Sequence, residues 1–192
     1  MDVFLFAAAA VRISVPYALA ALGATLSERG GVVCIALEGI MLNSALAYVL
    51  GTHGLGHPWL GVACALAAGV ATAALHALVT VKFRADQITS GLGINLLAMG
   101  LTRFVLQRVF HSSSNSPRVD GLPELPIGPL ADVPAVGPLL ASPLVIATLV
   151  LVVAVQFVLF RSVFGLRLRA IGERPEAAAT LGLSVPLHRT LG

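Results

Sequence analysis

Five long apolar segments run through this chain, and each is long enough to cross the hydrocarbon core of a lipid bilayer. A membrane-spanning helix needs about 20 residues, because the core is about 30 Å thick and a helix rises about 1.5 Å per residue. The segments are residues 4–26, 31–50, 59–81, 88–110 and 143–160. Inside a bilayer every backbone N–H and C=O needs a partner within the protein, which favours helices. The sequence therefore predicts an all-α, polytopic transmembrane bundle with about five spans.

The composition agrees with a membrane protein. The residues are 57% hydrophobic and 11% charged, whereas about a quarter of a soluble domain is charged. The basic residues are spread between apolar segments instead of forming one polar domain, so the net charge of +3 does not indicate nucleic acid as a partner. The first residues lack a basic region and carry Asp2, which favours a first span over a cleaved signal peptide.

Lys and Arg residues are distributed unequally between the two alternating sets of loops. The richer set holds Arg29, Lys82, Arg84, Arg161, Arg167, Arg169, Arg174 and Arg189. The other set holds Arg118, with Arg108 at a span end. Loops rich in Lys and Arg stay in the cytoplasm. We therefore expect an external N-terminus, a transmembrane bundle over 1–160 and a cytoplasmic loop over 161–192.

The long outer loop, 111–142, is rich in proline. It holds six of the eleven prolines: Pro117, Pro123, Pro126, Pro129, Pro134 and Pro138. Proline at this density disfavours both a helix and a central strand, and the loop also carries Asp120, Glu124 and Asp132. We expect an extended, exposed periplasmic segment. It is either a plain connector or a docking face for an external partner.

Oppositely charged residues lie inside the first two expected spans. Glu38 falls in the second segment and Arg12 in the first, although charged groups are costly in a bilayer. The two residues form a helix-fixing ion pair, or Glu38 is a carboxylate at a helix end, or Glu38 contacts the transported solute or ion. All three interpretations remain open.

Polar residues gather near the inner end of the fourth segment. Gln87, Ser90 and Asn95 surround Gly91 and Gly93, and glycines in a transmembrane helix let another backbone approach closely. Hydrogen bonding between helices and lining of a solute path are both compatible with this pattern. The candidate translocation pathway comprises Glu38, Gln87, Ser90 and Asn95.

Other patterns indicate packing or exclude chemistry. Gly61, Ala65 and Gly69 recur at every fourth residue, which predicts close helix packing. Neither Cys34 nor Cys64 belongs to a CxxC or similar metal-binding spacing, so we predict no metal site. The sequence has no phosphate-binding loop and no hydrolytic motif. We therefore predict no enzyme activity and no cofactor in this chain.

Residues 165–183, GLRLRAIGERPEAAATLGL, form a charged, amphipathic segment behind the last span. Its charges exclude it from lipid, so it is expected on the cytoplasmic face. Pro175 suits the first turn of a helix, acidic groups suit its positive end, and Gly182 suits its end. The residues expected to dock on a partner are Gly172, Glu173, Pro175, Glu176, Ala177, Ala178, Leu181 and Gly182.

Three stretches together resemble the integral membrane permease subunit of bacterial ABC importers, in the simple sugar and nucleoside branch. They are LSERGGVVCIALEGIML (26–42), ADQITSGLGINLLAMG (85–100) and the segment 165–183. Their order and spacing also match. The chain departs from the usual pattern at Cys34, where the family has Asn, at Ala36, where Gly is usual, and at Arg174, where Asn or His is common.

The resemblance implies a subunit that carries a nucleoside or simple sugar across the bacterial inner membrane. It implies a separate cytoplasmic ATPase that binds ATP and Mg²⁺ and docks on the coupling helix in 165–183. A second permease subunit, identical or related, and an extracytoplasmic solute-binding protein complete the implied assembly. Family members continue with further spans, so we expect the permease domain to extend beyond Gly192. The alternative is a secondary transporter or channel driven by an ion gradient, which intramembrane Glu38 and Arg12 would suit.

Overall fold

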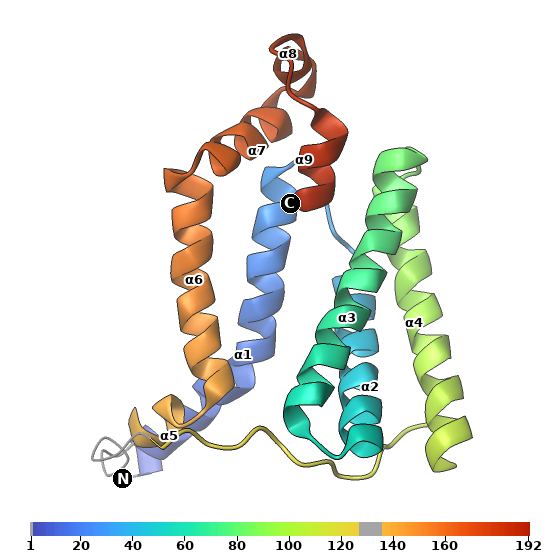
Figure 1. The fold of residues 1–192 in the computed structure, drawn as a ribbon, viewed down its shortest axis with the longest axis vertical. Coiled ribbons are helices and arrows are strands. Elements are labelled where there is room, and N and C mark those ends of the chain that lie inside the picture. The colour runs from blue at the N-terminus through green and yellow to red at the C-terminus, as the bar shows by residue number, and fades with distance from the viewer. Residues whose placement is uncertain (1, 127–135) are drawn as a thin grey trace. The chain divides into compact units, whose positions relative to one another are not determined.

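The computed structural model describes residues 2–126 and 136–192. Within these residues the secondary structure is helical, without strands, which confirms the all-α prediction (Figure 1). The chain forms two compact units. Unit 1 comprises Met1–Leu26 and Leu122–Leu166, and unit 2 comprises Ser27–Gly121 and Arg167–Gly192. The predicted division into a bundle and a C-terminal coupling loop is a functional one and stays a prediction.

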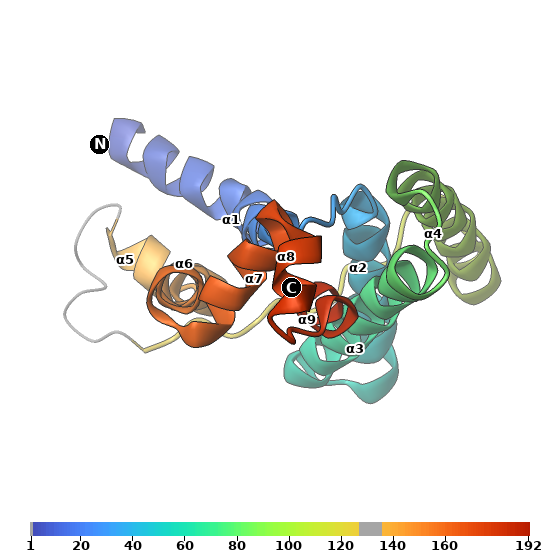
Figure 2. The same cartoon turned by 90° about the horizontal axis from the view of Figure 1, so that it is seen from above.

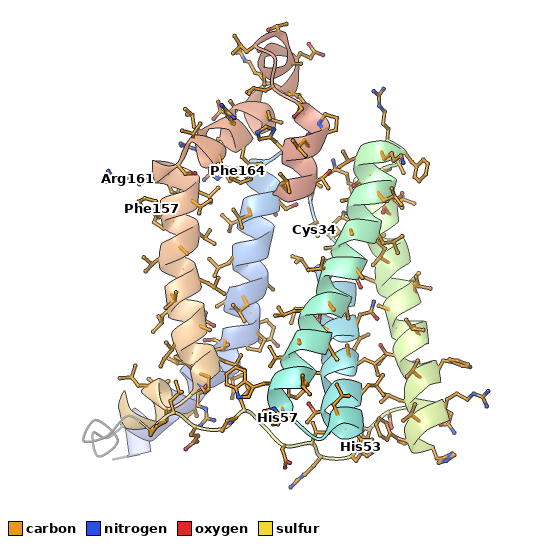
Figure 3. All side chains as sticks on the ribbon, in the orientation of Figure 1. Cys34, His53, His57, Phe157, Arg161 and Phe164 are labelled. Carbon is orange, nitrogen blue, oxygen red and sulfur yellow. The ribbon has the colours of Figure 1, made fainter. Side chains whose placement is uncertain are left out.

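Unit 1 contains most of α1 (Asp2–Arg29), together with α5 (Val136–Leu140), α6 (Pro143–Arg161) and the beginning of α7 (Val163–Glu173). Ser162 separates α6 from α7: its Oγ donates to the carbonyl of Val158 and accepts from the N–H of Gly165. A Cβ at Gly165 would clash with the α6 backbone, so glycine permits this sharp corner, which Figure 3 marks with Phe157, Arg161 and Phe164.

Unit 2 contains α2 (Leu37–Leu55), α3 (Pro58–Ala77), a π-helical turn η1 (Leu78–Lys82) and α4 (Gln87–Phe110). The rest of α7, α8 (Pro175–Thr180) and α9 (Val185–Leu191) complete it. Helix α2 packs against both α3 and α4, and α9 packs against η1 and the end of α3. Figure 2 shows α9 beside α3 and next to α8.

The small-residue stripe of α3 produces the close packing that its spacing predicts. A Cβ at Gly61 would meet the backbone oxygen of Tyr48 at 3.0 Å, and one at Gly69 would lie 2.8 Å from Oγ of Ser44. On the facing helix, a Cβ at Gly51 would lie 2.9 Å from Sγ of Cys64. Glycines on both helices therefore let α2 and α3 approach each other closely.

Four of the five expected spans correspond to helices long and apolar enough to cross a membrane, by length and composition: Phe6–Arg29, Pro58–Lys82, Gln87–Phe110 and Pro143–Arg161. The remaining one, the second expected span (31–50), was predicted to begin too early. Residues 31–36 are not helical, and the helix runs over Leu37–Leu55. Its first half carries Glu38, Asn43 and Ser44.

The outer loop is irregular and mostly exposed over 111–126, as expected. The expectation of no helix was wrong over Val136–Leu140, which forms α5. Pro138 is tolerated there because residues of a first helical turn donate no intrahelical hydrogen bond. Pro129, Asp132 and Pro134 lie outside the described residues.

Local contacts fix one end of unit 2, which consists of the turn between α2 and α3 and the end of α4. The ring of His57 accepts a hydrogen bond from the N–H of Trp59 and caps α3, while His53 stacks edge-on against Phe110. The hydroxyl of Tyr48 donates to the carbonyl of Asp120 at 3.0 Å and ties the loop to α2. Figure 3 places His53 and His57 at the opposite end of unit 2 from Cys34.

Candidate functional site

Residues 30–36, called the connector below, interrupt the chain between α1 and α2. Helix α1 ends in a Schellman motif, in which the N–H of Val32 donates to the carbonyl of Ser27 and that of Gly31 to Glu28. Gly31 has φ +81°, a conformation that glycine adopts without strain. The turn stops the helix although the apolar residues that follow it, 32–37, resemble a span.

Helix α4 holds the connector through two amide side chains. Oε1 of Gln87 accepts from the N–H of Val33 at 2.8 Å. Oδ1 of Asn95 accepts from the N–H of Gly39 at 2.8 Å, and its Nδ2 donates to the carbonyl of Ile35 at 3.0 Å. These bonds satisfy backbone groups that the interrupted helix leaves without partners.

This part of α4 contains two glycines, Gly91 and Gly93. The connector approaches the helix backbone closely at Gly91 but not at Gly93. A Cβ at Gly91 would lie 2.7 Å from Cβ of Ile35 and 3.1 Å from the backbone nitrogen of Ala36. A Cβ at Gly93 would have nothing within 4 Å. The connector therefore rests directly on the α4 backbone at Gly91.

Ser90, the third polar residue of this group, faces α3. Its Oγ lies 3.2 Å from Nδ1 of His76, within hydrogen-bonding distance. His76 is buried, and its Nε2 has no hydrogen-bond partner among the described residues. The same face of α3 carries Thr72, whose hydroxyl accepts from Nδ2 of Asn43. Polar contacts thus continue from α4 across α3 to α2.

Glu38 lies apart from these contacts in the first turn of α2, and it is exposed. A carboxylate at this position interacts favourably with the positive end of the helix, which agrees with the interpretation of Glu38 as a helix-end carboxylate. Arg12 belongs to unit 1 and Glu38 to unit 2. Their ion pair stays a prediction.

The C-terminal segment also contacts the connector, at Gly30 and Gly31, whereas α4 contacts it at Val33 and Ile35. Nε of Arg189 in α9 donates to the carbonyl of Gly30 at 3.3 Å. A Cβ at Gly31 would lie 3.2 Å from Cα of Gly172, and one at Gly172 would clash with the carbonyl oxygen of Arg29. Only glycine at both positions allows this backbone-to-backbone contact.

The expected coupling residues divide into buried and exposed ones. Ala178 is buried and Gly172 half-buried, whereas Leu181 is 82% exposed. The exposed group also includes Glu173, Glu176, Ala177 and Gly182, and Pro175 is half-buried. Helix α8 begins at Pro175, and the chain turns back after it at Gly182, which has φ +80°. Both ends of this helix agree with the sequence prediction.

Sequence reasoning missed α9 as an element. It treated Arg189 only as a loop charge, and it predicted no contact within the chain for Gly30, Gly31 or Gly172. The pair Ser184 and Pro186 gave a signal, because Ser is a frequent N-cap and Pro is frequent in the first helical turn. Nothing in the local sequence indicated the contact with Gly30, which is 159 residues away.

The start of α4 gives a prediction that depends on pH. Oδ1 of Asp86 accepts from both the N–H and the hydroxyl of Thr89 at 2.8 Å, and these bonds lower the pKa of this exposed carboxyl. Because the folded pKa lies below the unfolded one, the stabilisation is complete above the unfolded pKa and is lost as pH falls through the folded pKa. We expect the Thr89 amide to exchange hydrogen faster, relative to neighbouring amides, as the pH falls through that window.

The matched variant is Asp86→Asn, which keeps a capping oxygen but removes the charge. Its Thr89 amide should show no such pH-dependent loss of protection when exchange is followed by mass spectrometry. An equal loss of protection in the variant and the original protein would contradict the role of the Asp86 charge.

Within 2–126 and 136–192 no three His, Cys, Asp or Glu side chains are grouped to hold a metal ion. Cys34 and Cys64 are both free thiols.

Comparison with known proteins identifies related sequences over nearly the whole chain. The family described as the permease component of branched-chain amino acid transport systems matches residues 6–191. The guanosine ABC transporter permease protein NupQ of Bacillus subtilis is 38% identical over 187 residues, which is 92% of this chain and 58% of that protein. The nucleoside ABC transporter permease protein NupC of Lactococcus lactis is 37% identical over 190 residues, covering 93% of this chain and 59% of that protein.

A third relative is named for a different solute. The putative glucose ABC transporter permease protein TsgC13 of Haloferax volcanii is 36% identical over 189 residues, 95% of this chain and 56% of that protein. The chain thus spans a little under three fifths of the length of these curated relatives. No solved structure shows significant similarity.

Proposed function

The chain belongs to the family of permease components of branched-chain amino acid transport systems, and on this basis we propose that it is part of the membrane-spanning subunit of an ABC importer. It is a multi-pass membrane protein, given its family and its apolar helices. We propose that it lies in the bacterial inner membrane and imports a nucleoside or a simple sugar. Its relatives carry names for nucleosides and for glucose, so both solute classes remain in the proposal.

The observation that carries the proposal is the position of the C-terminal segment. Its helix α9 and Gly172 pack on the connector and on η1, while most of α8 stays exposed. Such an arrangement presents a short helix outside the membrane helices, anchored to them on one side. A separate cytoplasmic ATPase, which would bind ATP and Mg²⁺, is the partner we propose for this exposed helix. Hydrolysis would take place on that partner, and this chain would act as a transport subunit.

The distribution of basic residues supports the proposed orientation. The connector follows Arg29, the turn before α4 carries Lys82 and Arg84, and α9 carries Arg189. Contacts of α9 with η1 and with Gly30 bring these loops to one end of unit 2. Because loops rich in Lys and Arg face the cytoplasm, we assign this end to the inner face and the N-terminus to the outer face.

The proposed pathway includes Glu38, Gln87, Ser90 and Asn95. Gln87 and Asn95 are engaged with connector backbone groups, and Ser90 lies beside His76. In this conformation Gln87 and Asn95 stabilise the helix interruption, and solute would reach them when these bonds rearrange. A second permease subunit and an extracytoplasmic solute-binding protein would complete the transporter.

The source of energy tests this proposal. The full-length permease should co-purify with an ATPase and, in proteoliposomes with a solute-binding protein, take up nucleoside or sugar when ATP is supplied. Uptake should persist after ionophores collapse the ion gradients. Uptake that stops with the gradients and continues without ATP would instead establish a secondary transporter and refute the proposal.

A further inference from the structure

The connector is held at both ends by parts of the chain that are distant in sequence. At its start, Gly30 accepts from Nε of Arg189, and Gly31 touches Gly172 backbone to backbone. Both partners, Arg189 and Gly172, belong to the C-terminal segment that also carries α8. A contact between two glycine backbones has no flexible side chain to absorb a displacement, so movement of Gly172 toward Gly31 has to displace Gly31.

At its other end, the connector is held by α4. The N–H of Val33 donates a hydrogen bond to Gln87. Asn95 forms hydrogen bonds with the carbonyl of Ile35 and with the N–H of Gly39 in the first turn of α2. The connector also rests on the backbone at Gly91. Displacement of the connector therefore changes the contacts of α4 and of the beginning of α2.

The C-terminal segment reaches α3 by a second route. Helix α9 packs against η1, a π-helical turn at the end of α3, and Thr80 of this turn bonds back to the carbonyl of His76. Turns of this kind often occur at functional positions in helices. The first route, through the connector, has direct hydrogen bonds at both ends, to Arg189 and to α4. We therefore take it as the main route.

We propose that the connector transmits movement of the coupling segment to α4 and α2, with Arg189 and Asn95 as the positioning residues at its two ends. This inference rests on the proposed function, since it describes how docking of an ATPase would reach the solute path. Energetic coupling travels through contiguous contacts between elements that change arrangement together. Loss of either end should separate ATP hydrolysis from transport.

The test uses the full-length permease with its ATPase and solute-binding protein in proteoliposomes. In Arg189→Ala, solute taken up per ATP hydrolysed should fall about tenfold, within the range typical of coupling between sites. ATPase binding should be unchanged, because Arg189 lies on α9 and not on the exposed part of α8. Arg189→Lys should recover part of the coupling, since lysine can still donate to Gly30. Thr190→Ala, on the same helix, is the matched control and should behave like the original protein.

A double-variant cycle tests whether the two ends act together. If Arg189 and Asn95 act through one connector, Arg189→Ala combined with Asn95→Ala should lose no more coupling than the worse single variant. Losses that multiply would refute the shared route. Unchanged coupling in Arg189→Ala, with normal ATP-driven uptake by the original protein, would also overturn the inference and leave the proposed function intact. Absence of ATP-driven uptake in the original protein would refute the proposed function itself.

Hydrogen exchange gives a readout that does not depend on transport. In the assembled original protein, ATP should change the protection of the Val33 and Gly39 amides, which are bonded to α4. In Arg189→Ala that ATP-dependent change should disappear while protection without ATP is retained. An ATP-dependent change of the same size in both proteins would exclude Arg189 as the link.

Discussion

Replacing Gly91 by alanine should destabilise the permease, whereas the same replacement at Gly93 should stabilise it. A Cβ at Gly91 would lie 2.7 Å from Cβ of Ile35 and 3.1 Å from the nitrogen of Ala36, and overpacking of this kind costs about 1–3 kcal/mol. At Gly93 a Cβ has nothing within 4 Å. There the change should gain up to about 1 kcal/mol, the difference in helix propensity between glycine and alanine.

Thermal unfolding of the purified full-length variants in detergent measures both effects. The midpoint should fall for Gly91→Ala and rise or stay level for Gly93→Ala. The two residues are in the same helix and receive the same methyl group, so the variants differ in what that group meets: the connector at Gly91 and open space at Gly93. Equal shifts in the two variants would show that the connector does not rest on Gly91.

Leu181→Asp should greatly weaken ATPase binding without unfolding the permease. Leu181 is 82% exposed at the end of α8, so the proposed ATPase can cover its side chain. Central apolar contacts of an interface contribute about 2 kcal/mol or more, and an unpaired carboxylate there adds a desolvation penalty. We expect the dissociation constant of the permease–ATPase complex to rise at least about 30-fold, with a matching loss of uptake.

Two further variants separate docking from folding. Leu187→Asp changes a leucine that is 55% exposed on α9, outside the proposed docking helix, and should keep the affinity for the ATPase. Ala178→Asp places a carboxylate at a residue that is 3% exposed, so it should lower the thermal midpoint as well as the affinity. If Leu181→Asp bound the ATPase as tightly as the original protein does, α8 would not be the docking helix.

Local patterns in the sequence were sufficient for the four long apolar helices and for α8. Apolar length predicted α1, α3, α4 and α6, because the bilayer fixes the length that a spanning helix needs. The glycines of α3 predicted close helix packing, although not that α2 would be the partner, and Pro175 with Gly182 predicted the limits of α8. Each of these features depends on residues of one continuous segment of the chain.

The interruption at the connector was not predictable from the same patterns. Residues 32–37 are apolar apart from Cys34, and their hydropathy indicates a continuing span. The conformation depends instead on Gly31 at positive φ and on Gln87 and Asn95, which are more than 50 residues away. Gln87 and Asn95 were identified as important, but their partners are backbone groups, which no side-chain pattern reveals.

The bonds that Asn95 forms with Ile35 and Gly39 have a consequence for biosynthesis. A ribosome makes the connector and the start of α2 well before it makes Asn95, so these backbone groups lack their final partners while the intervening residues are translated. Because buried backbone groups need hydrogen-bond partners, water or the insertion machinery has to supply them in the meantime, and α2 should reach its final position only after α4 emerges. The order of synthesis and the order of membrane entry would then differ for this helix.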